Sequence, residues 1–115
     1  MKNGYIVVTG GAGFVGSNLI NLLLKKTKFK IISIDNYSSG SKANHIKDKR
    51  VKYVNSHCKN ISNIFKNPKV IHSIFHFGEF SRIYQSFNKM SDCMDSNIIG
   101  SNAIFNFCLE HNIKL

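Results

Sequence analysis

The 115-residue sequence predicts an α/β fold, in which helices cover both faces of a mostly parallel sheet. Short runs of β-branched residues alternate with segments whose apolar residues recur at helical spacing. Strands that alternate with helices form right-handed βαβ units, and these place helices on both faces of the sheet. The length suits a single small domain over residues 1–115.

The N-terminal half opens with a strand, a glycine turn and a helix. Residues 5–9 form a β-branched run that stops at glycine, which is typical of a buried parallel strand. Apolar residues then recur at helical spacing from Phe14 to the basic pair at 25–26. We expect a second strand over 30–34 that ends at Asp35, followed by a polar turn.

The C-terminal half repeats this alternation. Strands are expected at 51–55 and 70–77, with a short helix over 60–67 that stops before a proline. Helical periodicity returns from 91 to about 111, and 113–115 look like the start of another strand. The expected strand order is 3-2-1-4, which leaves the outer edge of the fourth strand unpaired and open to association.

The net charge of +10 raises nucleic-acid binding as an alternative, because cations displace counterions from a phosphate backbone. The excess consists of fourteen lysines and two arginines, which are scattered among many Asn and Ile residues. This bias favours genome composition over a binding surface as the explanation. Neither a membrane-length apolar run nor a signal peptide is present, so we expect no membrane contact and a cytoplasmic location.

The three cysteines, Cys58, Cys93 and Cys108, are odd in number and widely spaced. None forms a pair or a His-Cys group at zinc-like spacing, so we expect reduced, half-buried side chains and no metal site. His57 and Cys58 are adjacent, and on a strand their side chains would point to opposite faces.

Three glycines, Gly10, Gly13 and Gly16, separate the first strand from the helix. This pattern permits a tight turn, close approach of the backbone to a pyrophosphate, and close packing of the helix on the sheet. The amides at the helix N-terminus then face the anion. A tight turn without a ligand is the alternative that the glycines alone leave open.

Asp35 favours the ligand-binding interpretation. It lies nineteen residues after Gly16, at the expected end of the second strand. A carboxylate at that place accepts hydrogen bonds from an adenosine ribose and disfavours a 2′-phosphate. The sequence therefore predicts a Rossmann-like dinucleotide-binding domain that prefers NAD to NADP.

The segments "TGGAGFVGSNL" and "IDNYSSG", followed by "IFHFGEFSRIYQS" and "SNIIGS", resemble the extended short-chain dehydrogenase/reductase family. Its members include NAD-dependent epimerases and dehydratases of nucleotide sugars, such as UDP-glucose 4-epimerase. The resemblance covers the whole chain and does not identify the substrate.

The resemblance implies three groups of cofactor contacts. The pyrophosphate would meet the backbone of Phe14 and Val15. The adenosine ribose would be surrounded by Asp35, Asn36, Ser38, Ser39 and Gly40. The nicotinamide half would be approached by Phe77, Gly78, Glu79, Phe80 and Ser81, and Ser96 would touch the cofactor. For Ser96 and the segment at 77–81, an ordinary helix and an ordinary strand end remain alternatives.

Two positions depart from the family pattern. His57-Cys58 stands where the family usually has Asp-Ile or Asp-Val, whose carboxylate reads the adenine amino group. A neutral histidine can accept a hydrogen bond from that amine through one ring nitrogen. Gly78-Glu79 replaces the common Ala-Ala, and Arg82 follows, either to meet a sugar-nucleotide diphosphate or to pair with Glu79 or solvent.

The acid-base residues of the family, a Tyr-x-x-x-Lys pair and an upstream Ser or Thr, have no match in these 115 residues. None of the four tyrosines has a lysine four positions later, so no catalytic residue is assigned. We expect the NAD-binding portion of a longer enzyme whose substrate is a nucleotide sugar, inactive alone; a non-catalytic dinucleotide-binding module is the alternative. The resemblance also implies a homodimer through the helix at 91–111.

Overall fold

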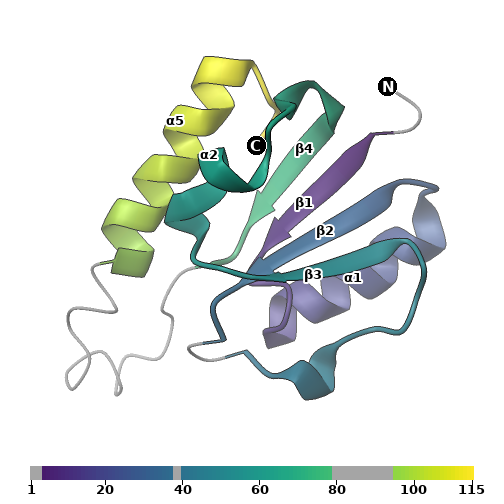
Figure 1. The fold of residues 1–115 in the computed structure, drawn as a ribbon. Coiled ribbons are helices and arrows are strands. Elements are labelled where there is room, and N and C mark those ends of the chain that lie inside the picture. The colour runs from purple at the N-terminus through teal and green to yellow at the C-terminus, as the bar shows by residue number, and fades with distance from the viewer. Residues whose placement is uncertain (1–3, 38–39, 79–94) are drawn as a thin grey trace, which may run out of the picture.

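The computed structural model describes residues 4–37, 40–78 and 95–115, and it contains one four-stranded parallel sheet (Figure 1). The strands are β1 (Tyr5–Thr9), β2 (Lys30–Asp35), β3 (Val51–Asn55) and β4 (Ile71–His76). Their order is β3-β2-β1-β4, and each neighbouring pair is parallel. This arrangement confirms the predicted fold class and strand order.

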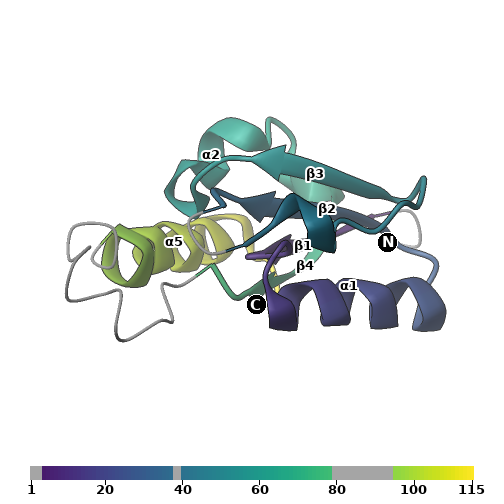
Figure 2. The ribbon, with the colours of Figure 1, turned by 90° about the horizontal axis from the view of Figure 1, so that it is seen from below.

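Helices cover both faces of this sheet. Figure 2 shows α1 (Phe14–Lys26) on one side and α2 (Ile61–Ile64) on the other. α5 (Ser101–His111) shares a buried cluster with α2 and the strands, formed by Val7, Ile32, Ile34, Cys58, Ile61, Phe65, Ile71, Ile74, Ile104, Phe107 and Cys108. On the α1 side the buried cluster is Ile6, Val8, Ile20 and Ile31. No helix of the described segments has the length and apolar character needed to cross a bilayer.

Two helical predictions need correction. The helix predicted over 60–67 is reduced to four residues, because the chain becomes extended at Phe65 and Pro68 starts a separate 3₁₀ turn. The helix predicted over 91–111 begins, in its described part, as a π-helical turn at Asp95–Gly100 before α5. Gly100, a poor helix former, ends that turn where the winding changes. Residues 91–94 lie outside the described segments.

The C-terminal residues change the expected outer edge of β4. Asn112 ends α5 in the left-handed region at φ 54°, which turns the chain back toward the sheet. Lys114 then forms a single parallel bridge to Ser73, and the Ile74 amide donates to the Lys114 carbonyl at 2.9 Å. The strand predicted at 113–115 is therefore one bridge, and the edge of β4 is paired there.

Arg50 binds the C-terminal end of α1. Its Nη1 donates to the Thr27 carbonyl at 2.7 Å, and its Nη2 donates to the Leu24 carbonyl. A guanidinium at this end satisfies free carbonyls and interacts favourably with the helix dipole. We expect Arg50→Ala to lower the free energy of unfolding by about 1–2 kcal/mol, measured by urea denaturation. Arg50→Lys should recover part of that loss, and equal stability of wild type and Arg50→Ala would contradict the capping role.

Candidate functional site

The carboxyl ends of β1, β2 and β4 meet the N-terminus of α1 at one edge of the sheet. The chain passes from β1 through α1 to β2 on one side, and β4 lies on the other side of β1. Ligands of open parallel sheets bind where the strand order reverses in this way. The predicted glycine turn lies at this reversal, between β1 and α1.

Gly10 and Gly16 are required by the packing of the turn. Gly10 has φ 72°, and a Cβ there would lie 2.5 Å from the Phe77 carbonyl oxygen. A Cβ at Gly16 would lie 2.2 Å from the Gly10 carbonyl oxygen. These distances are far below a van der Waals contact, so the turn, the helix and the chain after β4 approach each other only because both positions lack a side chain.

Gly13 and the first turn of α1 form a cradle that suits an anion. A Cβ at Gly13 would meet only the Gly10 carbonyl oxygen, at 3.3 Å, among the described residues. The amides of Phe14, Val15 and Gly16 have no hydrogen-bond partner within the described part of the chain, and no side chain caps the helix. Free amides at a helix N-terminus bind phosphate groups, so the turn fits a pyrophosphate.

The side chains of Phe14 and Val15 are 81% and 56% exposed, although their spacing matches the apolar face of the helix. They lie at its first turn, beyond the part of α1 that packs on the sheet, where only Gly16 and Ile20 are buried. Their contribution to the cofactor through the backbone stays a prediction, which requires the free amides of the first turn.

Asp35 is held against the glycine turn. Its side chain is buried, its Oδ2 accepts from the Ala12 amide at 3.0 Å, and its Oδ1 accepts from the Tyr37 amide at 2.7 Å. A carboxylate accepts about four hydrogen bonds, so capacity for ribose hydroxyls remains. Gly40 packs on the same group, since a Cβ there would lie 2.7 Å from Asp35 Oδ2. The negative charge is thus fixed beside the anion cradle, where it disfavours a further phosphate.

Asn44 and Ser41 add a second link between the turn and the segment after β2. The Ser41 amide and the Asn44 Nδ2 both donate to the Ala12 carbonyl, at 3.1 and 2.7 Å. No signal in the sequence pointed to these two hydrogen bonds, because Ser41 and Asn44 are both more than two dozen residues away from Ala12. Together with Asp35 it fixes the position of Ala12 within the turn.

Three aromatic rings that the sequence did not point to, those of Tyr37, His45 and Tyr53, pack in the segment between β2 and β3. Tyr37 adopts the left-handed region at φ 61°, and its hydroxyl is hydrogen bonded to His45 Nε2 at 2.5 Å. His45 stacks on Tyr53 with ring centroids 3.7 Å apart, and Tyr53 Oη accepts from the Ile46 amide at 2.8 Å. The strained backbone of Tyr37, which presents its amide to Asp35, is therefore anchored through its own ring.

The ionisation of Tyr37 provides a test of that anchor. Burial, followed by the charges of Asp35 and Tyr53, raises the pKa of Tyr37. A raised folded-state pKa gives stability that is complete below the unfolded pKa of about 10 and is lost as pH rises through the folded value. We expect the free energy of unfolding to fall above pH ~10, and to fall less steeply in Tyr37→Phe. Identical alkaline slopes in urea titrations of both proteins would contradict this.

His57 and Cys58 lie beyond the end of β3, so the condition for side chains on opposite faces, a place on a strand, is not met. His57 caps a 3₁₀ turn, where its Nδ1 accepts from the Lys59 amide at 3.1 Å. Neutral imidazole has one acceptor and one donor nitrogen, so Nε2 is the donor here. The acceptor role expected toward the adenine amine is not open in this arrangement.

Cys58 connects the β3 end to the chain after β4. Its side chain is 5% exposed, and its Sγ donates to the Gly78 carbonyl at 3.9 Å. Neither Cys58 nor Cys108 forms a disulfide within the described residues, and both are buried instead of half-buried as predicted, because each belongs to the core cluster shared by α5 and the sheet.

The remaining predicted contacts are placed only in part. Phe77 and Gly78 follow β4 and touch the glycine turn, while Asn36 is exposed next to Asp35. Ser96 belongs to the π-helical turn, and nothing is described of its side chain. The predicted positions Ser38, Ser39, Glu79, Phe80, Ser81 and Arg82 lie outside the described residues.

Comparison with known proteins gives a consistent family. A family model described as the NAD dependent epimerase/dehydratase family matches residues 6–115. A dTDP-D-glucose 4,6-dehydratase of Dictyostelium discoideum is 30% identical, over 95% of this chain and 27% of that protein. The solved UDP-N-acetylglucosamine 4-epimerase from Methanobrevibacter ruminantium M1, in complex with UDP-N-acetylmuramic acid, is 27% identical with a TM-score of 0.81, over 98% of this chain and 36% of that one.

A further solved structure, the dTDP-glucose 4,6-dehydratase DesIV from Streptomyces venezuelae with NAD and TYD bound, shows the same fold. Its TM-score is 0.83 at 23% identity, over 95% of this chain and 37% of that one. The chain thus spans 27% of the length of the Dictyostelium relative and little more than a third of either structure. The family is NAD dependent, in agreement with the cofactor expected from Asp35. Because the family model covers residues 6–115, the chain belongs to the NAD-dependent epimerase/dehydratase family.

Proposed function

We propose that this chain binds NAD and is the cofactor-binding portion of a nucleotide-sugar epimerase or dehydratase. The observation that carries the proposal is the buried Asp35 carboxylate, fixed 3.0 Å from the Ala12 amide beside the uncapped first turn of α1. The turn would hold the pyrophosphate, and Asp35 would accept hydrogen bonds from the adenosine ribose. When bound, NAD supplies the transient oxidation of a sugar hydroxyl.

The rest of the enzyme is part of the proposal. The relatives are about three times as long as this chain or longer, and an epimerase and a dehydratase are both among them. We place the Tyr-x-x-x-Lys pair, the upstream Ser or Thr and most of the sugar site in sequence that follows Leu115. This chain contributes cofactor binding and orientation, and the choice between epimerisation and dehydration depends on the remainder.

Calorimetric titration of the chain with NAD and with NADP tests the proposal. We expect saturable binding of one NAD per chain, weaker binding of NADP, and no turnover of UDP-glucose or dTDP-glucose by the chain alone. Absence of NAD binding by the folded chain would refute the function. A non-catalytic dinucleotide-binding module predicts the same titration, and it is distinguished by a full reading frame that lacks a Tyr-x-x-x-Lys.

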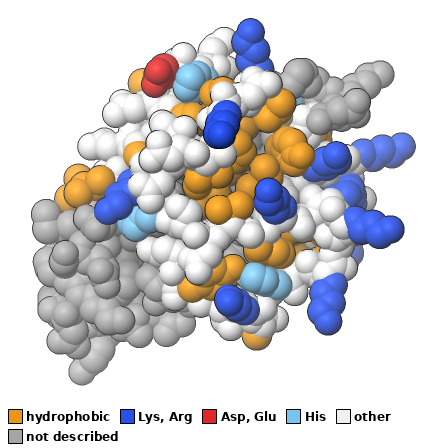
Figure 3. Space-filling view, viewed as in Figure 1, with side chains coloured by type: hydrophobic (Ala, Val, Ile, Leu, Met, Phe, Trp, Pro, Cys, Tyr) orange, Lys and Arg blue, Asp and Glu red, His pale blue; other side chains and the backbone are white. Residues whose placement is uncertain are grey.

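Nucleic-acid binding is the weaker alternative. Figure 3 shows several Lys and Arg side chains along the right-hand side of this face and others that stand singly, and hydrophobic side chains at the centre interrupt the positive surface. Groove or strand binding requires cations that form a continuous surface along a phosphate backbone. We therefore expect no salt-dependent affinity for duplex or single-stranded oligonucleotides that competes with NAD.

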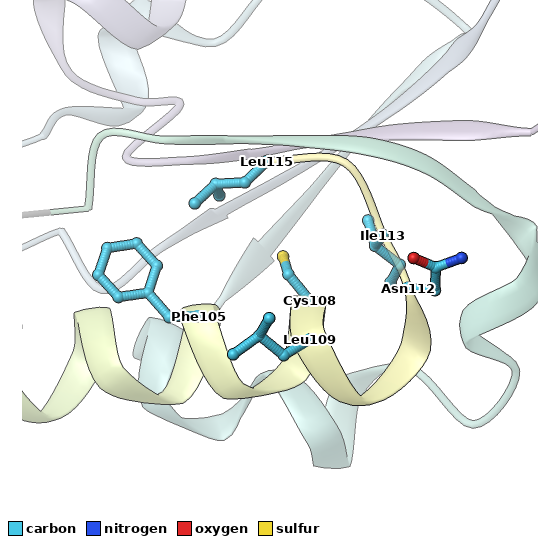
Figure 4. Close-up of a pocket in the computed structure, with 6 residues that line it drawn as sticks. All are labelled: Phe105, Cys108, Leu109, Asn112, Ile113 and Leu115. Atoms are coloured by element: carbon cyan, nitrogen blue, oxygen red, sulfur yellow. The ribbon is translucent and has the colours of Figure 1, made fainter.

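The outer surface of α5 supports the proposed homodimer. Phe105 and Leu109 are 45% and 81% exposed, and they border an apolar groove with Cys108, Asn112, Ile113 and Leu115 (Figure 4). Exposed apolar side chains on one helix face are typical of a surface that packs against another chain. We expect a dimer in sedimentation velocity and a monomer for Leu109→Glu. A monomeric wild type at micromolar concentration would argue against this interface.

A cytoplasmic location belongs to the same proposal. Neither Cys58 nor Cys108 forms a disulfide within the described residues, as expected of a protein from a reducing compartment. Fractionation of the native host with an antibody to the protein would test this location.

A further inference from the structure

His76, the last residue of β4, connects the sheet to α5 through two hydrogen bonds. Its Nδ1 lies 2.6 Å from Thr9 Oγ1, and its Nε2 lies 2.9 Å from Ser101 Oγ. Thr9 is fully buried and Ser101 is 5% exposed, while the His76 ring that joins them is half-buried. The imidazole thus links the carboxyl end of β1 with the first residue of α5.

The Thr9 hydroxyl also receives two amides from the chain that follows β4. The Gly78 amide donates to Thr9 Oγ1 at 3.0 Å, and the Phe77 amide is shared between Thr9 Oγ1, at 2.9 Å, and the Thr9 carbonyl, at 3.0 Å. A hydroxyl has one proton to donate and two lone pairs to accept with. Both lone pairs are occupied by the amides, so the hydroxyl proton is left for His76 Nδ1.

This count of protons fixes the state of the ring. Nδ1 must be an acceptor, because a proton there would meet the hydroxyl proton at an oxygen whose lone pairs are already in use. Neutral imidazole then carries its proton on Nε2, which donates to Ser101. A ring protonated on both nitrogens does not fit this arrangement.

We infer that His76, as the neutral Nε2–H tautomer, is a positioning residue: through the Thr9 hydroxyl it holds the Phe77 and Gly78 amides in place. The bearing on the cofactor rests on the proposed function. A Cβ at Gly10 would lie 2.5 Å from the Phe77 carbonyl oxygen and 3.1 Å from the Gly78 nitrogen. The segment at 77–78 therefore packs directly against the glycine turn and forms one wall of the proposed site. His76 thereby orients the wall of the proposed NAD site without touching the cofactor.

The state of the ring is testable in the wild-type chain without NAD. Nitrogen NMR of the histidine rings at mildly alkaline pH should show His76 as one fixed tautomer with Nδ1 unprotonated. A slowly exchanging Thr9 hydroxyl proton should correlate with that nitrogen. A ring protonated on Nδ1, or one that averages between tautomers, would overturn the inference.

Two substitutions separate positioning from packing. In His76→Asn the amide oxygen stands near the place of Nδ1 and still accepts from Thr9, whereas in His76→Gln the amide reaches toward Ser101 and leaves Thr9 without its acceptor. We expect hydrogen exchange of the Gly78 amide to accelerate about tenfold or more in His76→Gln and much less in His76→Asn, while the Phe77 amide stays protected by the Thr9 carbonyl. Thr9→Val should match His76→Gln, and Thr9→Ser should match wild type.

NAD titrations of the same variants complete the test. We expect His76→Gln to weaken NAD binding about tenfold, and His76→Asn to stay within about threefold of wild type. Equal effects of Asn and Gln on amide exchange would show a packing role and overturn the inference. If the exchange pattern holds while the wild type binds no NAD, the positioning role stands and the proposed NAD function fails, so the two failures are distinguishable.

Discussion

Asp35→Asn is expected to weaken NAD binding by about 10 to 100-fold and to bring the affinities for NAD and NADP close together. The substitution preserves the size of the side chain and removes its charge. Hydrogen bonds to a charged acceptor contribute about 1.5–3 kcal/mol each, and the proposed function has ribose hydroxyls donate to this carboxylate. Loss of the negative charge also removes the repulsion of a 2′-phosphate, so NADP should lose less affinity than NAD.

Asp48→Asn is the matched control for this experiment. Asp48 lies on the connection that follows Asp35, between β2 and β3, where it accepts from the Arg50 amide at 2.9 Å in an exposed position. The two variants make the same change of charge, and only one of them alters the cradle. Calorimetry should show wild-type affinity and wild-type discrimination for Asp48→Asn. Equal NAD binding by Asp35→Asn and wild type would remove Asp35 from the site.

The asparagine amide at position 35 also affects the fold. One of the two backbone amides that Asp35 accepts, from Ala12 or Tyr37, would face an NH₂ group. We expect the free energy of unfolding to fall by about 1–3 kcal/mol, so titrations belong at a temperature where circular dichroism shows both proteins folded.

Gly13→Ala is expected to abolish most NAD binding while the fold is retained. The new Cβ needs a shift of only a few tenths of an ångström from the Gly10 carbonyl, and its φ of −84° is ordinary for alanine. The methyl group would stand in the cradle above the free amides, where a diphosphate must approach the backbone closely. We expect affinity to fall at least tenfold, with a loss of stability below about 1 kcal/mol.

Gly16→Ala provides the contrast. Its Cβ would lie 2.2 Å from the Gly10 carbonyl oxygen, a backbone atom that cannot rotate away. Overpacking of this kind costs about 1–3 kcal/mol, so thermal unfolding should shift strongly in Gly16→Ala and little in Gly13→Ala. If Gly13→Ala binds NAD like wild type, no phosphate occupies this turn.

The strands and the outline of the site were predictable because their signals are local. β1 was predicted with its observed bounds, since a β-branched run ends at a glycine there. β4 was placed one residue too long at each end, because Val70 and Phe77 share its apolar character, while Val70 ends a 3₁₀ turn and Phe77 has no register partner in β1. The glycines and Asp35 were found because their spacing along the chain reflects the geometry of one turn and one strand.

The contacts that hold the site in shape were not predictable. Thr9 and His76 are 67 positions apart, and Ala12 and Asp35 are 23 apart. Polar residues that come into contact only when distant segments pack together show no local spacing pattern by which the contact could be recognised in the sequence. His57 differs, because its cap on the turn at Cys58–Asn60 is a local contact to the Lys59 amide, and this contact decides which ring nitrogen is the donor.

The central place of β1 has a consequence for folding kinetics. Only the helix α1 and its turns separate β1 from β2 in the sequence, so this pairing is fairly local. The pairing of β1 with β4 joins Thr9 to His76 and so closes a loop of more than half of the chain. Closing long loops is entropically costly, and non-local parallel pairings form slowly. We expect β1, α1, β2 and β3 to associate before β4 docks. Such an intermediate lacks the wall of the crevice at 77–78, so NAD should leave the refolding rate unchanged and slow unfolding instead.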